Sequence, residues 1–368
     1  MLSCARYLGT VLTAIALASV AGAQELAERD FLDSSAAVDS IVQPTRPIPP
    51  PLEPYASPLA TFYVTTDLVG FMRSNAGGVF ATNSARQRLF TGDDLDFAAQ
   101  PGLRTLLGVR LTDYVALEAS YLGLVDWNES HSLRNGATNA LGTAGALMSP
   151  FTQFGQPATA GFDYNRYVEV SVESQFNTAE VNLRHTIDLP YSTVQAAAIY
   201  GSRYMSLRDR LNYRSESAEP APAGTAIAVD VDTNNQMFGP QLGGALEMHV
   251  APRGWLNLEA KGIMLYNDAS QSTRFASGPL VGPAVPVFGT ASDKRLSYAA
   301  DLQATLSWRF AKAFVWRVGY QAIFIEGLAL GSENFGTNAL NASTDPSQLS
   351  KSGNIAIHGP FTGLTITW

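Results

Sequence analysis

The last nine residues of the chain alternate between apolar and polar side chains and end in an aromatic residue. The apolar set is Leu364, Ile366 and Trp368, and it alternates with Gly363, Thr365 and Thr367. A period of two is the pattern of a β-strand with one apolar and one polar face. In a transmembrane barrel the apolar face meets lipid and a terminal aromatic residue lies at the membrane interface. The pattern therefore predicts the closing strand of such a barrel, with the apolar set as its assembly signal.

The N-terminus has the features of an exported protein. Arg6 precedes an uncharged apolar run from Leu8 to Val20, and Ala21-Gly22-Ala23 matches a cleavage pattern. The run is short for a spanning helix, which needs about 20 residues, so a signal anchor is only the alternative. We expect residues 1–23 to be a signal peptide. The single cysteine, Cys4, lies within it, which leaves the mature chain without disulfides or cysteine metal sites.

A second N-terminal stretch differs in composition from the remainder of the chain. Residues 24–60 are first acidic and then hold six prolines between Pro44 and Pro54. Proline at this density favours an extended polyproline II spacer that offers few donors to a sheet. We expect a proline-rich periplasmic arm or linker here, with docking of a partner as the alternative.

Ten segments between residues 61 and 368 repeat the two-residue alternation. Most are about 10 to 16 residues long, and a tilted membrane strand needs roughly 9 to 11. Short connections fall near residues 112–113, 188–192, 251–254 and 311–313, and long ones near 74–101, 127–163, 209–234, 267–293 and 328–352. Their strict alternation is typical of outer-membrane barrels. The sequence predicts an all-β, antiparallel up-and-down transmembrane barrel over residues 61–368, with about ten strands, short periplasmic turns and long external loops.

One predicted strand, at residues 167–187, is irregular. Its apolar side chains are first even-numbered and then odd-numbered: Val168, Val170, Val172, Val181 and Leu183. A β-bulge near residues 175–178 would explain the switch. Alternatively, the first half projects above the membrane, where outward polarity is allowed. A turn near residues 176–177 is the third explanation, and it would make the strand count odd.

Charged residues on the polar faces are predicted to point into the lumen. They are Arg73, Arg104, Arg110, Glu118, Glu180, Arg184, Arg203, Glu247, Glu259, Lys261, Asp301, Arg309 and Arg317. They could line an aqueous, mildly cationic pore, or they could pair and hold the barrel shut, because buried charges must be paired or hydrated. About 8 strands leave a filled interior and about 16 an open channel, so ten favour a plugged or very narrow pore. Arg110 and Glu118 are predicted to pair across the first short turn.

Aromatic residues gather near the predicted short turns. They are Tyr114, Tyr191, Trp255, Trp308, Phe310, Trp316 and Trp368. Such clustering predicts a periplasmic aromatic girdle rather than the core of a sandwich.

Few residues suggest catalysis. The four histidines show no metal-ligand spacing, so we expect no metal site, no cofactor and no enzyme activity. Omptin-type proteases are ten-stranded barrels with Asp and His in their outer loops, and only His131, beside Asp126 and Glu129, could imitate them here. The net charge of -8 and the lack of a basic stripe argue against nucleic acid as a partner.

Several motifs together resemble those of a known family. They are Phe176-Asn177-Thr178-Ala179-Glu180-Val181-Asn182-Leu183-Arg184, Gly201-Ser202-Arg203-Tyr204, Gly239-Pro240-Gln241-Leu242-Gly243, Gly319-Tyr320-Gln321 with Glu326-Gly327-Leu328-Ala329-Leu330, and His358-Gly359-Pro360-Phe361-Thr362-Gly363-Leu364. In this order they resemble the putative beta-barrel porin 7 family, found mainly in planctomycetes. The resemblance runs from about residue 61 to the C-terminus. It implies an outer-membrane barrel and says little about activity.

These observations lead to two functional hypotheses. The first is a small porin for passive diffusion of small solutes, or a structural barrel of low conductance, in the outer membrane of a Gram-negative-type cell envelope. The second is a non-conducting barrel whose external loops bind a ligand or surface, as an adhesin or receptor does. The expected partners are outer-membrane lipid, the barrel-assembly machinery and possible small solutes.

Overall fold

The computed structural model describes the chain from residue 62 onward with short gaps. The described residues are 62–74, 76–134, 146–159, 161–187, 189, 194–217, 225–279 and 285–368. The predicted signal peptide and proline-rich arm lie outside them. None of the helices among these residues has the length and apolar character needed to cross a bilayer.

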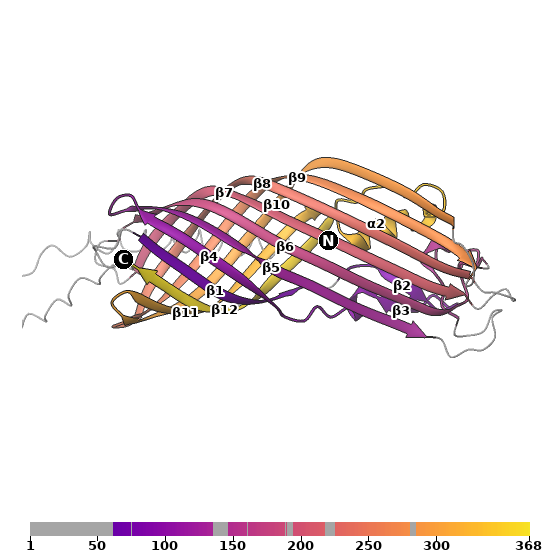
Figure 1. Ribbon diagram of the computed structural model, residues 1–368, viewed down its shortest axis with the longest axis horizontal. Coiled ribbons are helices and arrows are strands. Elements are labelled where there is room, and N and C mark those ends of the chain that lie inside the picture. Colours follow the sequence, from indigo (N-terminus) through magenta and orange to yellow (C-terminus); the bar gives the residue numbers. More distant parts are fainter. Residues whose placement is uncertain are drawn as a thin grey trace, which may run out of the picture. The chain divides into compact units, whose positions relative to one another are not determined.

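Ten antiparallel strands close into a barrel (Figure 1). They are β1 (Phe62–Arg73), β4 (Gln100–Arg110), β5 (Val115–Arg134), β6 (Asn165–Ile187), β7 (Val194–Ser217), β8 (Thr225–Ala251), β9 (Gly254–Pro279), β10 (Val285–Ala311), β11 (Phe314–Leu328) and β12 (Gly353–Thr367). Neighbours in the chain pair in order, and β12 pairs with β1, where Ile366 lies opposite Val64. The predicted fold class is confirmed, and the last strand closes the barrel as predicted.

Smaller elements belong to the long connections. They are the hairpin β2 (Val79–Thr82) and β3 (Arg88–Thr91), the 3-10 turns η1 (Gly92–Asp94), η2 (Pro150–Thr152) and η3 (Ala339–Asn341), and the helix α2 (Gly331–Asn338). Figure 1 shows β2, β3 and α2 at the end of the barrel away from the C-terminus. This end carries the long connections, and the other end carries the short turns.

The strands have two zones of opposite polarity. In the half next to the short turns, which we name the turn-side zone, apolar side chains face outward, among them Leu68, Leu107, Val181, Tyr200, Leu242, Met264, Leu302, Tyr320 and Leu364. In the other half, the loop-side zone, the apolar residues are buried inside: on β7, Leu211 and Tyr213 are buried whereas Arg208 and Arg214 are exposed. An apolar outer band is what lipid requires, and a polar outer face is what water allows. The change of polarity therefore marks the membrane boundary.

This reversal explains the irregular strand at residues 167–187. The even-numbered residues of β6 face inward along its whole length, from Val168 to Asn182, and β6 pairs with β7 without interruption from Tyr167 to Ile187. A turn near residues 176–177 is thus wrong, and the constant inward parity is what projection of the first half above the membrane predicts. A bulge does exist, but on the neighbouring strand β5, where Leu122 pairs with Thr178 and Val125 with Phe176.

Three of the predicted long loops are largely strand. Strands β5, β7 and β9 continue to residues 134, 217 and 279, respectively. The strands that follow them, β6, β8 and β10, begin at residues 165, 225 and 285. The predicted loops at 127–163, 209–234 and 267–293 are therefore too long. Their strands resemble loops in sequence because the outward residues are polar in the loop-side zone. The connections at 74–101 and 328–352 hold β2, β3, α2 and η3 instead.

Candidate functional site

The loop-side half of the barrel interior is filled by apolar side chains from three inward-folded connections. We name residues 76–97, 146–159 and 329–352 the plug. Phe151 of the plug lies edge-on to Tyr213 and Phe275 of the barrel wall, with ring centroids 5.4 and 5.7 Å apart. Phe335 stacks on Tyr213 at 5.0 Å. Plug and wall thus share one buried cluster.

Hydrogen bonds from buried polar residues of the wall hold the plug in place. The Asn235 side chain donates to the Ala329 carbonyl and accepts from the Ala329 amide, each at 2.8 Å. The Gly331 amide donates to Asp209 at 2.8 Å, and Gln271 donates to the Pro346 carbonyl at 3.0 Å. Buried polar groups are stable only when they are paired in this way. These contacts fix the backbone of the plug as well as its side chains.

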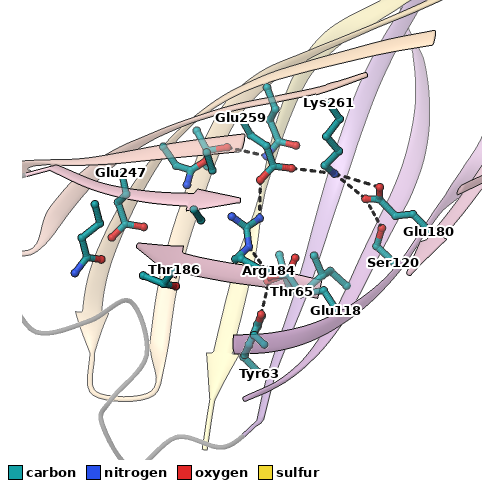
Figure 2. A pocket seen from close by; sticks show the side chains of 18 of the residues that line it. Tyr63, Thr65, Glu118, Ser120, Glu180, Arg184, Thr186, Glu247, Glu259 and Lys261 are labelled. Atoms are coloured by element: carbon teal, nitrogen blue, oxygen red, sulfur yellow. Dashed lines mark hydrogen bonds and ion pairs between the residues drawn. The ribbon is translucent and has the colours of Figure 1, made fainter. Parts of the chain in front are cut away.

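A continuous network of charged side chains crosses the turn-side interior next to the plug. Ion pairs join Glu118, Arg184, Glu259, Lys261, Glu180, Arg203 and Asp301 in that order, and Figure 2 shows their first part. Gln321 then links Asp301 to Arg104, which binds Asp67 at 2.6 Å. Arg317 lies 3.6 Å from Asp67. We name these residues the ion-pair network.

Phe361 of β12 lies where the network meets the apolar interior. The guanidinium of Arg104 is 4.3 Å from the ring centroid of Phe361, and that of Arg317 is 5.9 Å away. A cation over an aromatic face is attracted by the negative face of the ring. The Phe361 ring thus contacts cations of the network and also belongs to the buried apolar cluster, so it joins the two parts of the interior.

The signs of charge in the network balance. Its described residues include five cations and five anions: Arg104, Arg184, Arg203, Lys261 and Arg317, with Asp67, Glu118, Glu180, Glu259 and Asp301. Buried charges are stable when each finds partners of opposite sign. A balanced, mutually bonded set favours the interpretation that the charges hold the interior shut, over that of a cationic pore.

The residues predicted to face the lumen all lie on the inner side of the barrel wall. Nine of the thirteen lie in the network. Arg73 forms a separate buried ion pair with Asp209. The other three, Arg110, Glu247 and Arg309, lie near the short turns. The predicted pair of Arg110 and Glu118 is wrong, because Glu118 lies opposite Gly108 and Arg110 opposite Ala116. Glu118 instead accepts from Tyr63 at 2.7 Å and from Arg184 at 2.9 Å.

A cavity of about 440 Å³ lies between the network and the short turns. Inward alanines leave this space, at Ala116 on β5, Ala197 on β7 and Ala245 on β8. Arg110 and Glu247 also line it. Among the described residues, none of β12 does, so the small polar face of the closing strand is not the source of the space; its Thr365 is bonded to Thr65 at 2.8 Å.

Most of the predicted girdle faces outward, with one correction. The side chains of Tyr114, Trp308, Phe310, Trp316 and Trp368 are exposed near the short turns. Trp255 is wrong as a girdle residue: it is 4% exposed and packs inside, with the Arg309 guanidinium 5.7 Å from its ring. Tyr191 lies outside the described residues. Leu364 and Ile366 are exposed beside Trp368 on the closing strand, as the alternation predicts.

The three residues of the predicted His131 group all lie in β5 rather than at a loop tip, and Asp126 does not share a face of the strand with His131. His131 lies in β5 and packs against Phe90 at 5.1 Å, and Asp126 is exposed on the same strand. Residues five positions apart on a regular strand point to opposite faces. The described part of the chain also contains no cluster of three or more His, Cys, Asp or Glu that could hold a metal ion.

The strand count favoured a plugged or very narrow pore, but sequence reasoning did not identify the connections that form the plug. The six aromatic residues of the plug all fall in predicted external loops: Phe80, Phe90, Phe97, Phe151, Phe154 and Phe335. Loops exposed to water seldom need several phenylalanines, so their number was the available signal.

An apolar outer band, a closed ten-stranded ring and an interior divided into charged and apolar parts define an outer-membrane type of β-barrel with a plugged lumen. The chain belongs to the family described as Putative beta barrel porin-7, whose model matches residues 57–356. The family is one of outer-membrane β-barrels, in agreement with the resemblance seen in the sequence. A search of curated proteins gives no match.

Solved structures with some likeness are barrels as well. The outer membrane protease OmpT of Escherichia coli is 10% identical, with 84% of this chain and 97% of that chain covered and a TM-score of 0.45. The CymD monoaromatic hydrocarbon channel is 8% identical, with 84% and 89% covered and a TM-score of 0.22. A FadL homologue of Pseudomonas aeruginosa is 9% identical, with 84% and 89% covered and a TM-score of 0.19. Likeness at this level carries no argument about function.

Proposed function

We propose that this protein is a structural outer-membrane barrel of low conductance, closed to the free diffusion of solutes. The plug carries the proposal, since it fills the loop-side interior with a buried cluster that includes Phe80, Phe151 and Phe335. A solute would have to displace these side chains and then break the balanced ion-pair network. Both barriers act in series, so opening one is not sufficient. The barrel is inserted into outer-membrane lipid by the assembly machinery, and it has no enzymatic role.

Planar-bilayer conductance of the purified full-length protein tests the closure. We expect no steady open-channel current from protein whose folding is verified by heat-modifiable gel migration. The matched variant replaces residues 331–350 by a short Gly-Ser linker and carries Glu180→Gln and Arg203→Gln, which weakens both barriers. It should conduct, and this result shows that the assay detects inserted barrels. A steady current from the unmodified protein would overturn the proposal.

One observation favours the second hypothesis, a non-conducting platform that binds a ligand at the outer end. A hollow of about 340 Å³ is lined by Arg86, Arg88, Gln153 and Phe154, among others. Three of these have left-handed backbones, with φ of 61° at Arg86, 53° at Gln153 and 59° at Phe154. Such strain clusters at ligand sites. Two exposed arginines beside an aromatic ring suit an acidic saccharide.

Binding of dextran sulfate to the purified barrel tests this second hypothesis. Saturable binding that falls at least tenfold in Arg86→Ala with Arg88→Ala supports it. The control is Arg166→Ala, an exposed arginine paired with Glu216 on other strands. Equal binding by all three proteins assigns the interaction to general charge and rejects the site.

A further inference from the structure

We infer that the cavity at the short-turn end binds a small zwitterion of the α-amino acid class. The cavity, of about 440 Å³, falls within the range of roughly 300 to 1,000 Å³ that is usual for small-molecule sites. Its wall near the network is already charge-balanced. The groups that remain for a ligand therefore lie nearer the short turns.

Of the described charged side chains that line the cavity, three form no ion pair with the network: Arg110 and Asp113 beside the first short turn, and Glu247, which the charges of Arg184 and Arg309 attract. The exposed Asp113 carboxylate has access to water, whereas Arg110 and Glu247 are only partly exposed. Within the described residues, neither the Arg110 guanidinium nor the Glu247 carboxylate has a hydrogen bond or an ion pair, although both line the cavity. In Figure 2 no dashed line reaches Glu247, whereas Arg184, Glu259 and Lys261 are joined. Charges held in a confined site are costly unless they are hydrated or paired. A ligand that brings both signs of charge satisfies both groups at once.

The strand order places these two groups on facing walls. Arg110 is on β4 and Glu247 on β8, four steps apart in a ring of ten strands. Strands about 4.8 Å apart and tilted by about 40° close a ten-stranded ring on the order of 20 Å across. The two side chains project into this width from nearly opposite sides. One small molecule with its cation and its anion close together fits the gap between them.

The surfaces between the two charges suit the rest of an amino acid. Ala116, Ala197 and Ala245 face the cavity between Arg110 and Glu247, and Leu106 adds a larger apolar side chain. A ligand with one charge only would leave the opposite group unpaired, and a long polyamine or diacid would meet a group of its own sign. An apolar α-amino acid places its carboxylate on Arg110, its ammonium on Glu247 and its side chain on the alanines.

The inference does not depend on the closure of the barrel. The cavity lies on the short-turn side of the network, so a solute from that side reaches it without crossing the plug. By the usual orientation of such barrels this side is the periplasm. Conductance and binding are separate measurements, and either proposal can fail while the other stands.

Calorimetric titration of the full-length protein in detergent micelles tests the inference. The probes are L-leucine, N-acetyl-L-leucine, which lacks the cation, L-leucinamide, which lacks the anion, and O-phosphoethanolamine, which represents a lipid headgroup. We expect saturable binding of one L-leucine, with each blocked form at least tenfold weaker, since it loses one charge-assisted contact. Tighter binding of O-phosphoethanolamine would overturn the amino acid class and assign the site to a lipid headgroup.

Variants locate the site. Arg110→Gln and Glu247→Gln should each weaken leucine binding by about tenfold to a hundredfold, and the double variant should lose less than the product of the two factors because both hold one ligand. Ala245→Trp fills the cavity and should abolish binding. Arg166→Gln, an exposed residue of the loop-side zone, is the matched control. Unchanged binding in folded Arg110→Gln and Ala245→Trp proteins, or no saturable binding by the unmodified protein, rejects the site.

Discussion

The carboxylate of Asp209 lies 2.7 Å from the guanidinium of Arg73, and both side chains are 1% exposed. The second oxygen of Asp209 accepts the Gly331 amide at the start of α2. One buried carboxylate therefore joins β7, the end of β1 and the plug. Arg73 is also covered by the ring of Phe97, with its guanidinium 4.4 Å from the ring centroid.

Asp209→Ala should destabilise the barrel strongly. It leaves the Arg73 charge buried without its partner and the Gly331 amide without its acceptor. We expect a loss of about 3 to 5 kcal/mol in the free energy of unfolding, measured by urea titration in micelles. Glu216→Ala breaks the exposed pair with Arg166 and should cost less than about 1 kcal/mol. Similar losses in both variants would contradict the role given to Asp209.

Phe335→Ala should loosen the plug. The ring is buried between Tyr213, Phe151 and Phe80, at centroid distances of 5.0, 5.8 and 5.8 Å. Removing it leaves a cavity that its rigid neighbours cannot fill, and we expect a loss of about 3 to 5 kcal/mol. Increased protease cleavage within residues 329–352 is the readout for the plug itself. The control Leu340→Ala removes an exposed side chain and should leave the cleavage pattern unchanged.

In the turn-side zone the strands could be predicted from the alternation of apolar and polar residues, because the outer face meets lipid and the inner face lies in a polar lumen. Alternation at Leu364, Ile366 and Trp368 predicts the closing strand correctly, and the register Val64 to Ile366 confirms its partner. In the loop-side zone the outer face meets water and the inner face packs against the plug, so polar residues face outward and apolar residues face inward. On a strand such as β6 the even-numbered residues face inward along the whole length, but they are apolar only in the loop-side zone. In the turn-side zone the apolar residues are the outward, odd-numbered ones. In the sequence this change looks like an irregularity.

The site was predictable in part for a similar reason. Alternation tells which charges face inward, but it does not tell which of them meet across the lumen. Arg184 reaches Glu259 across β7 and β8, and Arg203 reaches Asp301 in the same way, so neither pair follows from adjacency in the sheet. The predicted pair of Arg110 and Glu118 failed because the β4–β5 register places Gly108 opposite Glu118.

The Asp232 carboxylate should make stability depend on pH. Burial acts to raise the pKa of Asp232, but the hydrogen bonds and charges of Arg208 and Arg210 outweigh it, so the pKa lies below its ordinary value. A depressed carboxyl pKa adds stability above the unfolded-state pKa of about 3.9, and this contribution is lost as the pH falls through the folded-state pKa. The small excess stability over Asp232→Asn, seen in urea at pH 6, should shrink as the pH is lowered below the unfolded-state pKa. An excess that is constant over this range would contradict the prediction.

Removal of Trp368 should impair assembly. The Trp368 amide and carbonyl each form a 3.1 Å bond with Phe62, and the two rings stack at 6.4 Å. The residue thus completes the seam between the first and last strands, and its exposed ring is of the kind expected at a membrane interface. We expect less heat-modifiable barrel in outer-membrane fractions for the truncated chain. Phe310→Ala, which removes another exposed aromatic residue near the short turns, is the control. Normal insertion of the truncated chain would speak against the role of Trp368.

The membrane boundary can be located with two arginine substitutions on one strand. Leu302 and Thr290 both face outward from β10, the first in the turn-side zone and the second in the loop-side zone. Because a charge on the lipid face is costly, Leu302→Arg should lower the free energy of unfolding by about 2 to 4 kcal/mol in lipid vesicles. Thr290→Arg, exposed to water, should change it by less than about 0.5 kcal/mol. In a detergent-free buffer the protein should not remain soluble in either form, since the apolar band that contains Leu302 would face water. A larger loss for Thr290→Arg than for Leu302→Arg would place the membrane at the other end of the strand and reverse the assignment of the two zones.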